Sequence, residues 1–222
     1  MAERAPLHEA TALQHHFESM EQQKDASSLG MWVFLVTEIL FFGGLFLAYM
    51  IYRWENPLVF ARASHHMNVA LGTLNTAVLI CSSLTMAMAV HSAALGRRKL
   101  LILFLIVTMV LGATFLGVKV IEYTDHIEHH LLPGPRFHYP DPADARPAEI
   151  FFSLYFAMTG LHAIHMIVGL GIMATLLVMA GRGRFTAAYH TPVEISGLYW
   201  HFVDIVWIFL FPLLYLIGRH LH

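Results

Sequence analysis

The sequence predicts an all-α integral membrane protein, built as a bundle of five transmembrane helices. Of its 222 residues, 57 % are hydrophobic and only 13 % are charged. The apolar residues gather in five blocks, each of about 20 residues or more, the length that a helix needs to cross about 30 Å of hydrocarbon. The residue-by-residue alternation of a membrane β-barrel strand is absent, and the blocks are too long for such strands.

The predicted spans divide the chain into a polar segment and a membrane domain. They cover residues 29–52, 67–95, 100–123, 150–180 and 193–218. Residues 1–27 are polar and acidic, so we expect no removable targeting sequence, and the first span itself is the predicted insertion signal. The expected domains are a cytoplasmic segment, 1–27, and a five-helix domain, 28–222, with an outer loop at 124–149.

Lysine and arginine predict the orientation. The N-terminal segment and the loops after spans two and four share one side, which carries seven basic residues, against five on the other side. The run Arg97-Arg98-Lys99 lies in the tightest loop, and Lys119 is interpreted as lying near a helix end. Because basic residues in short loops stay in the cytoplasm, we expect the N-terminus there and the C-terminus outside.

The first span carries a carboxyl, Glu38, near its middle. It lies roughly 15 Å along the helix axis, and its sequence neighbours Ile39 to Phe42 offer no charge. An ionisable residue at this depth costs about 3 kcal/mol or more, which indicates a function or a partner. Two interpretations stay open: a neutral, hydrogen-bonded helix contact, and a role in proton handling or assembly.

The second span contains a cysteine, and the third span is predicted to continue as a helix beyond the membrane. Cys81, the single cysteine, excludes an internal disulfide and is expected to be a small core residue. The polar residues Glu122, Asp125, His126 and His129 recur at helical spacing. They predict that the third helix continues beyond the membrane with a polar face.

The fourth span contains two histidines, His162 and His165, three residues apart and thus neighbours on one helix face. A pair at this spacing could hold a metal. Without further ligands at the same depth, we favour hydrogen bonds to other helices or to lipid head groups.

The fifth span carries the densest polar face of the chain. Helical spacing aligns Trp200, His201, Asp204 and Trp207, so this face is expected to contact protein rather than lipid. His201 and Asp204, three residues apart, are candidates to pair with each other. Thr191 and Glu194 at the start of the span have the pattern of a capping box.

A second class of protein, the membrane di-iron hydroxylases, also fits part of the pattern. Residues 126–130 have the HxxHH spacing of those enzymes. Such sites need about eight histidines on one membrane face, whereas the candidates here differ in depth and side. Phosphate-binding, nucleophile-elbow and haem-attachment motifs are absent from the sequence.

Three motifs, residues 37–42 (TEILFF), 159–165 (TGLHAIH) and 197–207 (GLYWHFVDIVW), resemble helices of the cytochrome c oxidase subunit III family. By this resemblance, Glu38 corresponds to the buried carboxyl facing a lipid cleft. Trp200, His201, Asp204 and Trp207 form the family's polar helix face. Family positions of less certain role are matched by Glu122, His162, His165 and Glu194.

The resemblance implies a non-catalytic subunit of a respiratory haem-copper oxidase, which transfers electrons from cytochrome c to oxygen and pumps protons. Haem and copper would be held by partner subunits, so the only expected ligands of this chain are structural phospholipids. Expected partners are catalytic subunit I and the other oxidase subunits, and no nucleic acid. A larger respiratory supercomplex is a further candidate partner for the outer loop and residues 14–16, although a solvated loop is favoured.

The long form of the family has seven spans, and this chain corresponds to the last five. The short form is common in bacteria, which implies a multi-pass protein of the bacterial inner membrane. Another subunit or bulk lipid would then supply the second wall of the lipid cleft. Quinol oxidase subunits and accessory proteins of nitric oxide reductases share the short form, but Glu38 and the complete 199–204 motif favour a cytochrome c oxidase.

Overall fold

The computed structural model describes residues 17–135 and 137–217. Within this part of the chain the helices are α2 Met20–Glu55, α3 Pro57–Ser64, α4 Val69–Ala94, α5 Arg98–Glu128, α6 Ala145–Gly181 and α7 Thr191–Tyr215. Five of them, all except α3, are long and apolar enough to cross a membrane. The predicted all-helical membrane fold is therefore confirmed. Residues 1–16, most of the predicted polar segment, lie outside the described residues.

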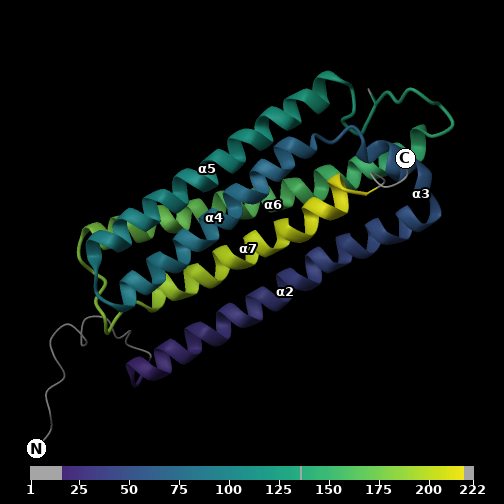
Figure 1. Ribbon diagram of the computed structural model, residues 1–222. Coiled ribbons are helices and arrows are strands. Elements are labelled where there is room, and N and C mark those ends of the chain that lie inside the picture. Colours follow the sequence, from purple (N-terminus) through teal and green to yellow (C-terminus); the bar gives the residue numbers. More distant parts are fainter. Residues whose placement is uncertain (1–16, 136, 218–222) are drawn as a thin grey trace, which may run out of the picture.

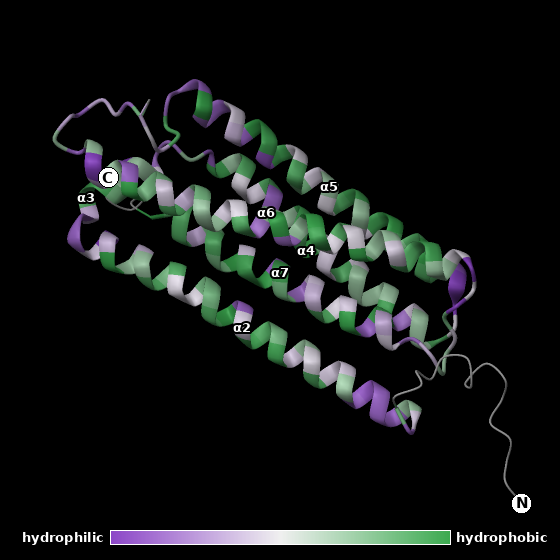
Figure 2. Cartoon of the chain, turned by 180° about the vertical axis from the view of Figure 1, so that it is seen from behind, coloured by the Kyte–Doolittle hydropathy of each residue, from purple (hydrophilic) through white to green (hydrophobic). Residues whose placement is uncertain are grey.

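The five long helices lie side by side, and their connections lie at two opposite ends (Figure 1). The start of α2 and the loops α4–α5 and α6–α7 share one end, whereas α3, the loop after α5 and the end of α7 share the other. Hydrophobic residues run along the helices, and hydrophilic residues concentrate towards the ends (Figure 2). This distribution suits a bundle that stands in a membrane.

Helix α7 is the centre of the bundle, and α2 is at its edge. Helix α7 contacts α2, α4 and α6, and 56 % of its most apolar stretch is buried within the protein, against 11 % for α2. The face of α2 that points inward is marked by Leu35, Phe42 and Tyr49. Most of α2 therefore presents apolar side chains to the surroundings of the bundle.

The short helix α3 is a feature that the apolar blocks did not predict, because eight residues are too few to span a membrane. Pro57 starts it, where a missing N–H costs nothing. Phe60 is fully buried against Tyr49 of α2 and Phe151 of α6. Helix α3 thus packs as a cap across the end of the bundle.

Helix α5 continues past the apolar block, as predicted, and ends at Glu128. It ends there because His130 adopts a positive φ of 57° and the N–H of Leu131 reaches back to the carbonyl of His126 at 3.0 Å. This is a Schellman-type ending. The helix therefore ends before Pro133, the first proline after it.

Two local predictions are wrong. The N-cap of α7 is His190, not Thr191, and no side chain caps that helix end. Glu194 instead contacts Nε2 of His190 at 3.1 Å and Nζ of Lys24 at 3.5 Å, which ties α7 to the start of α2. Cys81 is exposed rather than in the core, because its side of α4 faces outward.

Candidate functional site

Glu38 has a partner that its own sequence neighbourhood could not reveal. Its Oε2 atom lies 3.1 Å from Nε2 of His165, which belongs to α6 and is 127 residues further along the chain. Both side chains are mostly buried, with 19 % and 13 % of their surface exposed. The pair therefore links the middle of the edge helix to the bundle.

The histidine of this pair is fixed by its neighbours. Its Nδ1 atom lies 2.9 Å from the carbonyl of Leu161, and its own carbonyl accepts a hydrogen bond from the hydroxyl of Tyr199 at 2.9 Å. The ring of Phe42 covers it at a centroid distance of 5.5 Å. With Nδ1 on a carbonyl, that nitrogen carries the proton, and Nε2 faces the carboxyl.

Two apolar grooves lie along α2, and His165 lines one of them. One, of about 410 Å³, lies beside His165 and Tyr199 and is completed by Phe34 and Ile172. The other, of about 510 Å³, lies between α2 and α7 and is lined by Trp32, Leu35, Phe46, His201, Phe202 and Phe209. Their apolar walls match the chemistry of lipid acyl chains.

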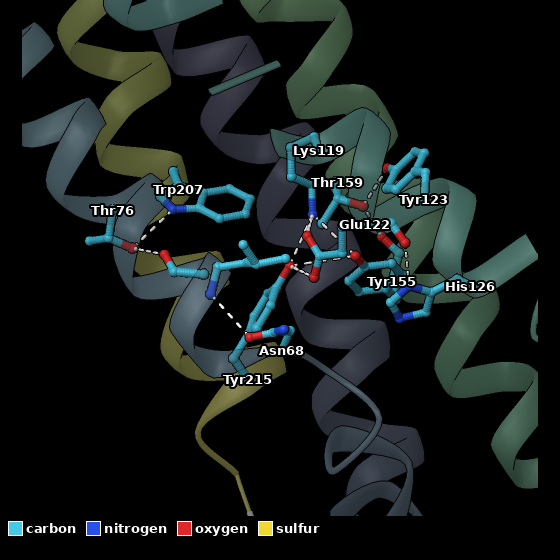
Figure 3. Close-up of polar contacts among 12 residues, drawn as sticks. Asn68, Thr76, Lys119, Glu122, Tyr123, His126, Tyr155, Thr159, Trp207 and Tyr215 are labelled. Carbon is cyan, nitrogen blue, oxygen red and sulfur yellow. Dashed lines mark hydrogen bonds and ion pairs between the residues drawn. The ribbon is translucent and has the colours of Figure 1, made fainter. Parts of the chain in front are cut away.

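Of the predicted polar face of α7, Trp200, Asp204 and Trp207 are buried in the bundle, whereas His201 is only partly buried. The indole of Trp200 donates to Ser82 on α4 at 2.9 Å and packs against the backbone at Gly112 of α5 and Gly169 of α6. Trp207 donates to Thr76 on α4 at 3.1 Å (Figure 3). Each tryptophan therefore connects α7 to neighbouring helices.

The predicted pairing of His201 with Asp204 is wrong. Nδ1 of His201 lies 2.7 Å from the hydroxyl of Ser83 on α4. Asp204 is 2 % exposed, and neither of its oxygens is hydrogen-bonded to His201. The i,i+3 spacing places the two side chains on one face of α7, but the ring nitrogen of His201 is hydrogen-bonded to Ser83 of the neighbouring helix α4.

His162 and His165 do not act as a pair. His162 is 1 % exposed, its ring nitrogens have no partner in the described part of the chain, and it packs against Phe115 at 5.3 Å and Trp207 at 5.3 Å. His165 turns towards Glu38 instead. Across residues 17–135 and 137–217 no three His, Cys, Asp or Glu side chains gather as a metal site would need.

A buried ionic network surrounds Lys119, which lies well inside α5 and not near a helix end as predicted from the sequence. Its Nζ lies 2.7 Å from Oε2 of Glu122, 2.9 Å from the hydroxyl of Tyr215 and 3.1 Å from that of Tyr155 (Figure 3). Tyr215 donates in turn to Oε1 of Glu122 at 2.6 Å. The ammonium also lies 5.1 Å from the ring centre of Trp207. All three ammonium donors thus have acceptors.

The signal that could have found this network was the i,i+3 spacing of Lys119 and Glu122 inside an apolar run. Opposite charges at that spacing are neighbours on a helix. A lysine inside a membrane span indicates a function only if it lies deep in the membrane. Lys119 is near the end of the predicted span 100–123, so the sequence alone did not single it out.

The histidines of the HxxHH stretch also face local partners. Nδ1 of His126 lies 2.6 Å from the carbonyl of Glu122, and Nδ1 of His129 lies 2.8 Å from that of Asp125. His66 precedes this stretch in the chain but lies near it. Burial lowers the pKa of His66 below its usual value, and the nearby His126 and His129 lower it further. His66 is therefore neutral at pH 7, packed on the rings of Tyr139 and Phe152.

Comparison with known proteins identifies the family of this chain. The family model described as cytochrome c oxidase subunit III matches residues 4–219. The chain is 33 % identical over 193 residues to a cytochrome c oxidase subunit 3 of Corynebacterium diphtheriae, covering 86 % of this chain and 87 % of the relative.

Two further relatives are named for different oxidases, one for a cytochrome c oxidase and one for a quinol oxidase. One is a cytochrome c oxidase subunit 3 of Thermostichus vulcanus, 32 % identical with 89 % of this chain and 90 % of the relative covered. The other is a quinol oxidase subunit 3 of Bacillus subtilis, 30 % identical with 90 % and 92 % covered. A match over nearly the whole length, on a bundle with five candidate spans, means that this chain belongs to the cytochrome c oxidase subunit III family.

Proposed function

We propose that this chain is the non-catalytic third subunit of a haem-copper oxygen reductase. Its role is to stabilise the complex, to bind phospholipid and to support proton uptake while catalytic subunit I reduces oxygen. In this proposal haem and copper are held by partner subunits, and the protein belongs to a proton-translocating oxidoreductase of the bacterial inner membrane. The observation that carries it is the pair of Glu38 and His165, which joins two of the candidate membrane spans and adjoins an apolar groove lined by His165.

The proposed proton-handling role follows from the position of this pair. Glu38 is near the middle of α2, the helix with the least buried apolar stretch among the candidate spans. A partly exposed carboxyl at that depth has few ways to exchange a proton except through a partner or water in a lipid-lined groove. His165 supplies such a partner at 3.1 Å. The pair can share one proton, which either group releases to the other.

Phospholipid is the proposed ligand of the grooves. The groove between α2 and α7 is lined almost entirely by apolar side chains, among them Trp32, Phe46 and Phe209. A lipid acyl chain there would bridge the edge helix to the centre of the bundle. Structural lipid would thereby help to hold α2, which has few buried residues of its own.

The proposed orientation places the N-terminal segment in the cytoplasm. Arg97, Arg98, Lys99, Arg182 and Arg184 all lie in or next to the α4–α5 and α6–α7 connections, at the end that also contains the start of α2. Basic residues in short loops favour the cytoplasmic side. The outer loop before α6 would then face the outside.

We propose cytochrome c rather than quinol as the electron donor of the complex. Glu38 and the Tyr-Trp-His-Phe-Val-Asp run of α7 support this choice. A quinol oxidase is the second candidate, favoured by the similarity to the Bacillus subtilis relative.

The test is to tag the chain, extract it from its native membrane in mild detergent and record the visible spectrum of the purified material. Copurified a-type haem with oxidation of cytochrome c is the expected result. Haem b or o with quinol oxidation would move the chain to the quinol branch, and nitric oxide reduction would select the accessory-protein alternative. A haem-free chain carrying stoichiometric iron would refute the proposal.

A further inference from the structure

One ring nitrogen of His201 is not used inside the bundle. Its Nδ1 atom lies 2.7 Å from the hydroxyl of Ser83 on α4, and the same hydroxyl is hydrogen-bonded to the carboxyl of Asp204. Among the described residues Nε2 has no hydrogen-bond partner. The two oxygens of Asp204 are enclosed by protein, whereas Nε2 belongs to a partly exposed ring. Nε2 is therefore the end of this network that a ligand can reach.

The network determines what kind of group Nε2 can bind. A serine hydroxyl has one proton to donate, and a neutral imidazole has one donor nitrogen and one acceptor nitrogen. If the carboxyl of Asp204 is ionised, Ser83 donates to it and Nδ1 donates to Ser83, so Nε2 is an acceptor. If the carboxyl is neutral, it donates to Ser83, which donates to Nδ1, so Nε2 is a donor. In both arrangements Nε2 has one unmet hydrogen bond.

His201 lies in the wall of the groove between α2 and α7. At about 510 Å³ this groove is within the size range of small-molecule sites, which combine apolar and aromatic walls with a few polar groups. Of the lining side chains, only those of His201 and Trp32 contain a polar atom. Aromatic side chains suit a flat, ring-bearing ligand, and five of them line the groove besides His201: Trp32, Phe42, Phe46, Phe202 and Phe209.

The depth of His201 limits the ligands that can reach Nε2. His201 is the eleventh residue of the 25-residue helix α7, about 15 Å along its axis and hence near the middle of the membrane. Phospholipid head groups stay at the membrane surface, and acyl chains have neither donors nor acceptors. An uncharged ring with an oxygen substituent and an isoprenoid tail dissolves in the hydrocarbon and carries the missing group to this depth.

We propose that the groove between α2 and α7 is a binding site for an isoprenoid quinone, whose ring oxygen is hydrogen-bonded to Nε2 of His201. A quinone carbonyl accepts from Nε2 when that nitrogen carries a proton, and a quinol hydroxyl donates to it when it does not. The quinone is a bound ligand in this proposal, and the proposed electron donor of the complex is unchanged. The inference rests on the proposed function in one respect, since it names a ligand other than phospholipid for one of the proposed lipid grooves.

The test is photolabelling of the tagged complex, purified in mild detergent from native membranes, with an azido-quinone probe. His201→Phe removes Nε2 and keeps a flat ring. Gly43→Leu fills the groove without changing His201, because Gly43 lines the groove and nothing lies within 4 Å of its Cβ position. Gly44→Leu is the matched control, since Gly44 is equally open but is not part of the lining. Immunoblots of the membranes identify any variant that fails to insert.

We expect the probe to label α2 or α7 of the wild-type chain, and His201→Phe and Gly43→Leu each to lower the labelling roughly fivefold or more, as the loss of a hydrogen bond would. Gly44→Leu should be labelled like the wild type. An excess of unlabelled quinone should compete, and solubilised phosphatidylglycerol should not. Absent labelling of α2 and α7, equal labelling of all four proteins, or equal competition by phosphatidylglycerol would overturn the quinone site while the proposed function stands. If the tagged wild-type chain copurifies with no haem protein, it is the proposed function that fails.

Discussion

At the scale of single residues, Lys119 is a cation that is only 3 % exposed inside the helical bundle, where an unpaired charge would be costly. It is tolerated because Glu122, Tyr155 and Tyr215 accept its three hydrogen bonds. Removing one partner of a buried ion pair leaves the other charge uncompensated, whereas replacing both by apolar or neutral groups is often nearly neutral. The network therefore behaves as a unit.

Lys119→Met should destabilise the isolated chain by about 3 kcal/mol, because Glu122 loses its counter-charge. The double variant Lys119→Met, Glu122→Gln should recover most of that loss. Both effects are measurable as shifts of the thermal unfolding midpoint in detergent. Equal destabilisation by the single and double variants would mean that the pair is not energetically coupled.

Glu38→Gln keeps the size of the side chain and a hydrogen-bonding group for His165 but removes the proton exchange. We expect a complex with unchanged haem content whose proton uptake and turnover are lower. The measurement is oxygen consumption together with proton release, per haem, in reconstituted vesicles. A complex that fails to assemble would assign Glu38 a structural role instead.

The sequence alone predicted which of these residues are unusual but not which residues they contact. Glu38, Asp204 and His162 stand out because ionisable or polar groups inside long apolar runs are costly. The partner of Glu38 could not be predicted, because it is His165 of another helix, 127 residues further along the chain. Spacing within one helix predicted the face of His201 correctly but not its partner.

At the scale of helices, α7 holds the bundle together through close contact with two glycines. A Cβ at Gly169 would lie 2.8 Å from the indole of Trp200, and one at Gly112 would lie 2.9 Å from it. Small residues let helices approach closely in membranes, where packing replaces the hydrophobic effect between helices. Trp200 can then lie between α5 and α6 while donating to Ser82 of α4.

Gly169→Ala should destabilise the bundle by about 1–3 kcal/mol, because the added methyl displaces the indole from a filled site. Gly171→Ala on the same helix is the control, since nothing lies within 4 Å of its Cβ position. The control should be neutral or gain up to about 1 kcal/mol of helix propensity. Thermal unfolding in detergent compares the two, and equal midpoints would refute the packing role of Gly169.

At the scale of the whole molecule, the sequence predicted the five spans because long apolar runs are the strongest signal in a membrane protein. It missed the short helix α3, whose burial depends on contacts with Tyr49 and Phe151. The bundle combines a well-packed centre around α7 with a loosely attached edge helix and apolar grooves. Such a molecule is suited to attach to a larger complex and to hold lipid against it.

The most direct test of this account is to purify the oxidase from cells with and without this chain and follow its activity through sustained turnover. We expect the same haem spectrum per complex in both preparations and a markedly faster loss of activity without the chain. Loss of a haem or copper signal from the complex would contradict a non-catalytic role. Identical haem content and identical lifetime of activity would contradict the supporting role.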